Sequence, residues 1–162
     1  MPMWVTALLL VCAVVVRPAL ADDREKLIGI WQLVSWEVEF QDTGERRAVY
    51  GPNPLGYLIL TPEGRMMAVV EGDGRKTPHT EAERATAFQT MIAYSGTYRV
   101  EGDRWITKVD ATWNPAWRGT DQARFFKFEG DRLSVLSIWQ PQVNFGGRVG
   151  RGILSWQRWK QQ

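Results

Sequence analysis

Cysteine and histidine are almost absent from this 162-residue chain, which contains one residue of each. Cys12 lies in an apolar stretch near the amino terminus, so the rest of the chain has no cysteine with which to form a disulfide bond. His79 has neither a second histidine nor a cysteine beside it for a zinc site, and we interpret it as a solvated loop residue. The sequence therefore predicts no metal site and no cofactor, and packing and hydrogen bonds must hold the fold.

Signatures of catalysis and of nucleic-acid binding are also missing. A serine, histidine and aspartate triad could be built only around His79, and the Gly-x-Ser-x-Gly motif does not occur. The segment Gly72-Asp73-Gly74 lacks the third glycine of the dinucleotide-binding fingerprint, so we interpret it as a turn. A net charge of +2, with scattered basic residues, argues against nucleic acid as a partner.

The amino-terminal segment resembles a secretory leader. The apolar run Trp4 to Val16 is too short for a membrane span, which needs about 20 apolar residues. It is followed by Ala19-Leu20-Ala21, with small residues at the two positions that a signal peptidase reads. We therefore expect a signal peptide over residues 1–21, one domain over residues 22–162, no stable membrane span after cleavage, and export to the periplasm or the medium.

The remainder of the chain is dominated by runs of alternating apolar and polar residues. Short turns containing Gly, Asp or Pro separate four such runs, Tyr94–Val100, Trp105–Trp113, Gln122–Phe128 and Leu133–Trp139. Because these gaps cannot hold a helical crossover, the runs are predicted to be consecutive antiparallel strands.

Further strands are predicted on both sides of this meander. The run from Leu27 to Phe40 is long enough for the first strand of a barrel, and a change in its alternation indicates a bulge near Gln32. Shorter runs follow, and Tyr57–Leu60 lacks alternation, as expected where both faces are covered. These additional runs are Arg46–Tyr50, Tyr57–Thr61, Arg65–Val70 and Val149–Trp159.

One amphipathic helix is predicted over Glu81 to Ala93. Thr80 and Glu83 have the spacing of a capping box, and apolar residues recur at helical intervals. We expect this helix to cover the side or one end of the sheet. The predicted fold is therefore all-β, an antiparallel up-and-down β-barrel of about eight to ten strands with one short α-helix.

Several motifs spread along the chain resemble one family. Gly29-Ile30-Trp31 matches the Gly-x-Trp signature of lipocalins, and the other motifs are Tyr50-Gly-Pro-Asn-Pro-Leu-Gly56, Thr61-Pro-Glu-Gly-Arg-Met66, Ala93-Tyr-Ser-Gly-Thr-Tyr98 and Asn114-Pro-Ala-Trp-Arg-Gly-Thr120. Together they are similar to the bacterial and fungal lipocalin-like domain family. The resemblance implies a calycin-type barrel that binds a small molecule, with Trp31 plugging one end beneath an arginine. Since the last strand should pair with the first, Arg151 and Arg158 are the candidates for that arginine.

Arg124 is the most informative charged residue. It shares a strand face with Phe126 and Phe128, so it points inward if those rings line the interior. A buried guanidinium needs a partner, which could be Asp110, Glu37 or an anionic ligand. Alternatively, Arg124 lies at the barrel rim or stacks on Trp31 as a structural latch.

Three functions are compatible with these features. The first is non-covalent binding of a small hydrophobic or amphiphilic molecule inside the barrel, with Met66, Ala68 and Val70 forming an adaptable apolar wall. The second is a cofactor-free isomerase or cyclase that uses Tyr, Asp and Arg in the cavity. The third is a structural or interaction module in which the eight tryptophans that follow the leader fill the barrel. The candidate ligand-binding residues are Tyr57, Met66, Ala68, Tyr98, Asp110, Trp113, Arg124, Phe126 and Trp139, and no catalytic residue is assigned.

Overall fold

The computed structural model describes residues 19–142 and 145–160. The predicted apolar run of the leader, Trp4 to Val16, lies outside these residues. In chain order the elements are α1 (Ala19–Leu27), β1 (Gly29–Phe40), β2 (Arg46–Ala48), β3 (Leu55–Leu60), β4 (Arg65–Glu71), α2 (Glu81–Gln89), β5 (Met91–Glu101), β6 (Arg104–Thr112), η1 (Pro115–Trp117), β7 (Asp121–Glu129), β8 (Arg132–Leu136), β9 (Gln140–Pro141) and β10 (Val149–Arg158).

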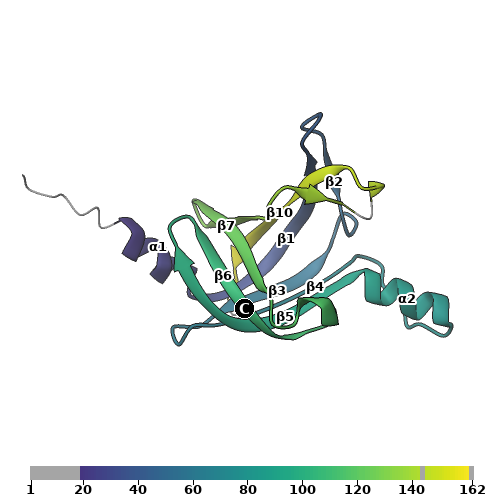
Figure 1. The fold of residues 1–162 in the computed structure, drawn as a ribbon, viewed down its shortest axis with the longest axis horizontal. Helices are drawn as coiled ribbons and strands as arrows, with labels where there is room; N and C mark the ends of the chain where they lie inside the picture. Colours follow the sequence, from purple (N-terminus) through teal and green to yellow (C-terminus); the bar gives the residue numbers. More distant parts are fainter. Residues whose placement is uncertain (1–18, 143–144, 161–162) are drawn as a thin grey trace, which may run out of the picture.

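Eight antiparallel strands form a closed barrel (Figure 1). They follow one another in the order β1, β3, β4, β5, β6, β7, β8 and β10, and β10 pairs with β1 to close the ring. The register along this seam runs from Trp31 opposite Arg158 to Phe40 opposite Gly150. The short strands β2 and β9 extend the sheet beside β1 and β10. The predicted antiparallel up-and-down barrel is confirmed.

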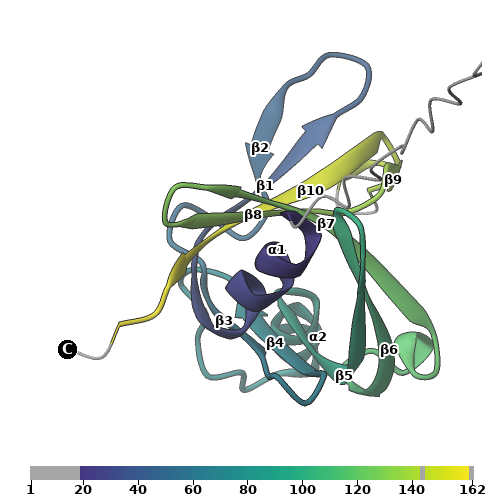
Figure 2. The ribbon, with the colours of Figure 1, turned by 90° about the vertical axis from the view of Figure 1, so that its left-hand side faces the viewer.

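Tight turns join the strand pairs at one end of the barrel. Gly64, Gly102 and Gly130 have φ angles of 86°, 62° and 60° in the turns after β3, β5 and β7. A residue with a Cβ atom adopts this left-handed conformation only at an energetic cost. α1 lies across the same end, as Figure 2 shows, whereas α2 and η1 belong to connections at the opposite end.

The predicted bulge in the first strand is present. The register of β1 against β10 shifts between Leu33 and Ser35, slightly beyond the expected position near Gln32. The shift places Trp31 and Leu33 on the inner face before it and Trp36 and Val38 on the inner face after it. A bulge adds one residue to a strand, so odd-numbered residues face the interior before it and even-numbered residues face the interior after it.

The expectation that Tyr57–Leu60 is covered on both faces is wrong. Gly56, Leu58 and Leu60 are buried, whereas Tyr57 is 46% exposed. The segment alternates in burial although its composition does not alternate, because apolar residues are tolerated on the outer face.

The helix is shorter than predicted. Its capping box is confirmed, since the Thr80 hydroxyl accepts from the Glu83 backbone N–H and the Glu83 side chain accepts from the Thr80 N–H. The helix ends at Gln89, and Met91–Ala93 belong to β5, where they pair with Val69–Glu71 of β4. No residue of α2 is buried, and the helix projects from the barrel rather than covering it (Figure 1).

None of the helices among residues 19–142 and 145–160 has the length and apolar character to cross a membrane.

Candidate functional site

Side chains from all eight barrel strands line the interior. Residues that face each other across a strand pair share a face of the sheet, so the registers identify the inner set. This set forms one hydrophobic core and includes Leu33, Leu58, Leu60, Met66, Ala68, Val70, Tyr98, Trp105, Val109, Phe126, Leu133, Val135 and Trp156. The structure therefore brings four of the predicted uncharged residues, Met66, Ala68, Tyr98 and Phe126, into the interior.

Trp31 closes the end beneath α1. It is 2% exposed, and its indole N–H donates to the carbonyl oxygen of Leu27 over 2.9 Å. The Arg158 guanidinium carbon lies 4.1 Å from the centre of its ring, and Arg158 also donates to the carbonyl oxygens of Ile28 and Lys26. A Cβ atom on Gly29 would lie 2.3 Å from an Arg158 nitrogen, so glycine leaves room for this arginine. The predicted contact between Trp31 and an arginine is made by Arg158.

Arg151 and Trp139 lie elsewhere, so of the two candidate arginines Arg158 is the one over Trp31, and Trp139 does not share the interior with the other predicted residues. Arg151 donates to Glu39 over 2.6 Å, on the outer face opposite Trp36 and Val38. Trp139 is 39% exposed and stacks on Arg151 at 4.6 Å, because the sheet pairing of β8 ends at Leu136. The hydrogen bond from Arg151 holds the pKa of Glu39 below its usual value.

Asp110 and Tyr57 also lie outside the barrel. Thr107 and Val109 point inward on β6, so Asp110 between Val109 and Ala111 points outward. It accepts from Arg65 over 2.5 Å and from the Ser95 hydroxyl over 3.0 Å, and the bond from Arg65 lowers the pKa of its carboxyl group. Tyr57 is on the outer face of β3. The predicted convergence of Tyr, Asp and Arg is therefore not formed.

Tyr98 is buried, and its hydroxyl group forms a hydrogen bond at the closed end of the barrel. Its hydroxyl donates to the carbonyl oxygen of Thr61 in the turn after β3, over 3.0 Å. Burial raises the pKa of this phenol.

Arg124 faces the interior. It lies opposite the inward Trp105 in the pairing of β6 with β7 and shares its face with Phe126. Its side chain donates to the carbonyl oxygen of Ala123 over 2.8 Å and to the Gln122 side chain over 3.4 Å. Among the residues that the structure describes, no carboxylate pairs with it. The expected partners Asp110 and Glu37 are wrong, because both lie on the outer face, and the stacking position on Trp31 belongs to Arg158.

Aromatic rings surround the Arg124 guanidinium towards the end opposite α1. Its central carbon lies 6.0 Å from the Tyr94 ring centre and 5.7 Å from that of Trp117. Tyr94 and Trp117 pack edge to face at 5.3 Å, and Trp117 packs on the half-buried Trp113 at 4.9 Å. We call Tyr94, Trp113, Trp117 and Arg124 the rim cluster. The predicted Trp113 belongs to it.

Sequence reasoning missed several interior residues that alternation would have identified. Trp105 and Thr107 share a face of β6, and Trp156 shares a face of β10 with Leu154. Three indole N–H groups, of Trp36, Trp105 and Trp156, and the Thr107 hydroxyl are buried without a hydrogen-bond partner among the described residues. The interior therefore combines an apolar wall with several unused polar groups.

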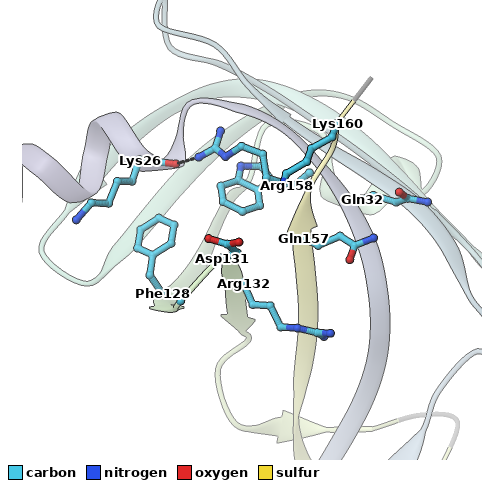
Figure 3. A pocket seen from close by; sticks show the side chains of 10 residues that line it. Lys26, Gln32, Phe128, Asp131, Arg132, Gln157, Arg158 and Lys160 are labelled. Atoms are coloured by element: carbon cyan, nitrogen blue, oxygen red, sulfur yellow. Dashed lines mark hydrogen bonds between the residues drawn. The ribbon is translucent and has the colours of Figure 1, made fainter. Parts of the chain in front are cut away.

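Two hollows lie outside the barrel interior. The larger, of about 660 Å³, lies beside the closed end between Lys26, Phe128, Asp131 and Arg158 (Figure 3). The smaller, of about 280 Å³, lies between α2 and the segment Asp73–Pro78. Most of the residues around both hollows are polar or charged, unlike those of the barrel interior.

Comparison with known families agrees with this geometry. The lipocalin-like domain family matches residues 28–159, from the plugged end of the first strand to the end of the last. The chain belongs to the lipocalin-like domain family. A comparison with curated proteins finds no match. Membership in the family supports a calycin-type barrel of the ligand-binding kind.

Proposed function

We propose that this lipocalin-like domain binds a small amphiphile with an acidic head group inside its barrel. One observation carries the proposal, namely that Arg124 faces the interior without a carboxylate partner among the described residues. Most of the other interior residues are apolar, so a ligand with an anionic head and a mainly apolar body matches the interior.

The surroundings of the Arg124 guanidinium compensate only partly for its burial. A guanidinium in a part-buried, ring-lined environment has lost some of its hydration, and rings at 5.7–6.0 Å return only part of that loss. Arginine presents several donors in a plane and binds a carboxylate through two parallel hydrogen bonds. The two neutral acceptors that Arg124 now uses leave other donors of its guanidinium for a ligand.

The position of Arg124 also suggests how the ligand enters. The end beneath α1 is plugged by Trp31 and Arg158. Arg124 reaches towards the opposite end, where it meets Tyr94 and Trp117. We therefore place the acidic head at the rim cluster and the apolar body deeper, against Met66, Ala68 and Phe126.

Titration with cis-parinaric acid, a fluorescent fatty acid, tests this function. Arg124→Leu should weaken binding by about 2 kcal/mol or more, the lower part of the range for truncating a buried charged partner, since Arg124 is only part-buried. The methyl ester of the probe, which lacks the charge, should bind wild type and Arg124→Leu equally. Lys127→Leu is the matched control, because Lys127 is on the same strand with an exposed side chain.

The outcomes separate the candidate functions. Equal loss of acid and ester binding in Arg124→Leu would show that the arginine shapes the pocket and does not select the charge. No binding of either probe to wild type would favour a barrel filled by its own side chains, as the ring contacts among Trp31, Phe128, Phe126 and Trp105 allow.

A further inference from the structure

The unpartnered polar groups of the interior can all donate a hydrogen bond. The side-chain groups concerned are the indole N–H groups of Trp36, Trp105 and Trp156 and the hydroxyl of Thr107. Trp105, Thr107 and Trp156 are 1%, 0% and 2% exposed, so bulk water does not reach them. An indole nitrogen can only donate a hydrogen bond, and a hydroxyl can donate one. Buried polar groups in native proteins are rarely left unpaired, and four in one barrel call for an explanation.

These donors come from different sides of the same interior. Trp105 and Thr107 are on the inner face of β6, where Trp105 lies opposite Arg124. Trp156 is on β10, opposite Leu33 and Leu133. Trp36 is on β1 and packs on the Tyr50 ring at 4.5 Å. These residues therefore belong to the inner face of the barrel, against which the proposed function places the ligand body.

Trapped water fits this lining poorly. A buried water molecule needs about two to four polar partners and must also donate its own hydrogens. Arg124 and the three indoles are all donors, so among these groups only the Thr107 hydroxyl can accept a hydrogen bond from a water molecule. A carbonyl or ether oxygen accepts hydrogen bonds and brings no donor of its own, so it satisfies such a lining without a new unpaired group.

We propose that the ligand carries neutral hydrogen-bond acceptors, carbonyl or ether oxygens, along its apolar body in addition to the acidic head. This proposal rests on the proposed function and narrows its ligand class. A saturated fatty acid leaves the interior donors unpaired and is a poor ligand, whereas an oxygenated acid pairs them.

A saturated acid and three of its oxo derivatives, which differ only in the position of the ketone, test the proposal. Dodecanoic acid is compared with 4-oxo-, 7-oxo- and 10-oxododecanoic acid by displacement of cis-parinaric acid. At least one oxo acid should bind about five- to tenfold more tightly than dodecanoic acid, the gain expected from one well-placed hydrogen bond. The preference should fall at least about threefold in one of the variants Thr107→Val, Trp36→Phe, Trp105→Phe or Trp156→Phe, which each remove one donor.

A matched control separates the loss of the interior Thr107 hydroxyl from the effect of any Thr→Val substitution. Thr97 is exposed on the neighbouring strand β5, next to the residue that pairs with Thr107, and Thr97→Val should leave every affinity unchanged. Thr107→Val should also leave the stability of the ligand-free protein undiminished, because its hydroxyl has no partner to lose. A marked loss of stability would show that the hydroxyl serves the fold and would overturn its role towards a ligand.

The remaining outcomes are equally decisive. If dodecanoic acid binds and no oxo acid binds more tightly, the inference fails while the proposed function stands. A preference that survives in all four donor variants also overturns it. If none of the acids displaces the probe and the probe itself does not bind, the proposed function and the inference fail together.

Discussion

At the scale of single residues, Trp31 is the side chain on which the closed end depends. It is 2% exposed, its indole N–H donates a hydrogen bond to the Leu27 carbonyl oxygen, and the Arg158 guanidinium lies over its ring. Trp31→Ala should lower the free energy of unfolding by about 3–5 kcal/mol, the usual cost of emptying a large aromatic site. Chemical denaturation measures this, with Trp159→Ala as a control, because Trp159 is 42% exposed. Equal and small losses in the two variants would mean that Trp31 is not a structural plug.

Tyr50 makes stability depend on pH in the alkaline range. Burial raises its pKa from 10.0 to about 12, and its hydroxyl donates to the Gln89 carbonyl oxygen. The unfolded chain therefore loses this proton first as the pH rises, so the free energy of unfolding should fall between about pH 10 and pH 12. Below pH 10 the contribution of Tyr50 is fully present.

Denaturation at a series of pH values checks this dependence. Tyr50→Phe should flatten the decline between pH 10 and 12, whereas Tyr57→Phe, at a 46% exposed position, should not. An unchanged decline in Tyr50→Phe would assign the pH dependence to other groups.

Period-two alternation accounts for both the success and the failures at this scale. It links Arg124 to Phe126 on one face, and the barrel then turns that face inward. The same rule places Asp110 on the outer face once Val109 is known to be on the inner face. The sequence did not show this, because Asp110 has apolar neighbours on both sides and either set of alternate residues could face the interior. Tyr57 was misplaced for a similar reason, since β3 has apolar residues on both faces.

At the scale of elements, α2 should open independently of the barrel. Its capping box satisfies its first turn, but none of its residues is buried. Thr80→Ala should cost the helix about 0.5–2 kcal/mol while leaving the global free energy of unfolding almost unchanged. Hydrogen exchange measures both quantities, with faster exchange expected only over Glu81–Gln89. Faster exchange in β1 or β10 as well would show that the helix supports the barrel.

The boundary of α2 shows where local sequence signals end. The capping box identified its start, but Met91 and Ile92 continue the apolar helical spacing and still enter β5. Their backbone groups pair with β4 across the sheet, a non-local interaction that outweighs local periodicity. The turns, by contrast, were predictable because Gly64, Gly102 and Gly130 need a positive φ.

At the scale of the whole molecule, the sequence also predicts export. The expected cleavage after Ala21 lies within α1, which spans Ala19–Leu27, so the mature chain would keep Leu27 and the plugged end. We propose that the protein acts in the periplasm or outside the cell. Amino-terminal sequencing of exported material should give Asp22 as the first residue, and cytoplasmic material that begins at Met1 would contradict export.

Binding inside the barrel is tested most directly by NMR of the tryptophan indole N–H groups during titration with cis-parinaric acid, the probe of the proposed function. The indole signals of Trp36, Trp105 and Trp156 are assigned with the three Trp→Phe variants. These interior signals should shift together and saturate, while those of the exposed Trp139 and Trp159 stay in place. Shifts confined to Trp139 and Trp159, or no shifts at a saturating concentration, would contradict ligand binding in the barrel interior.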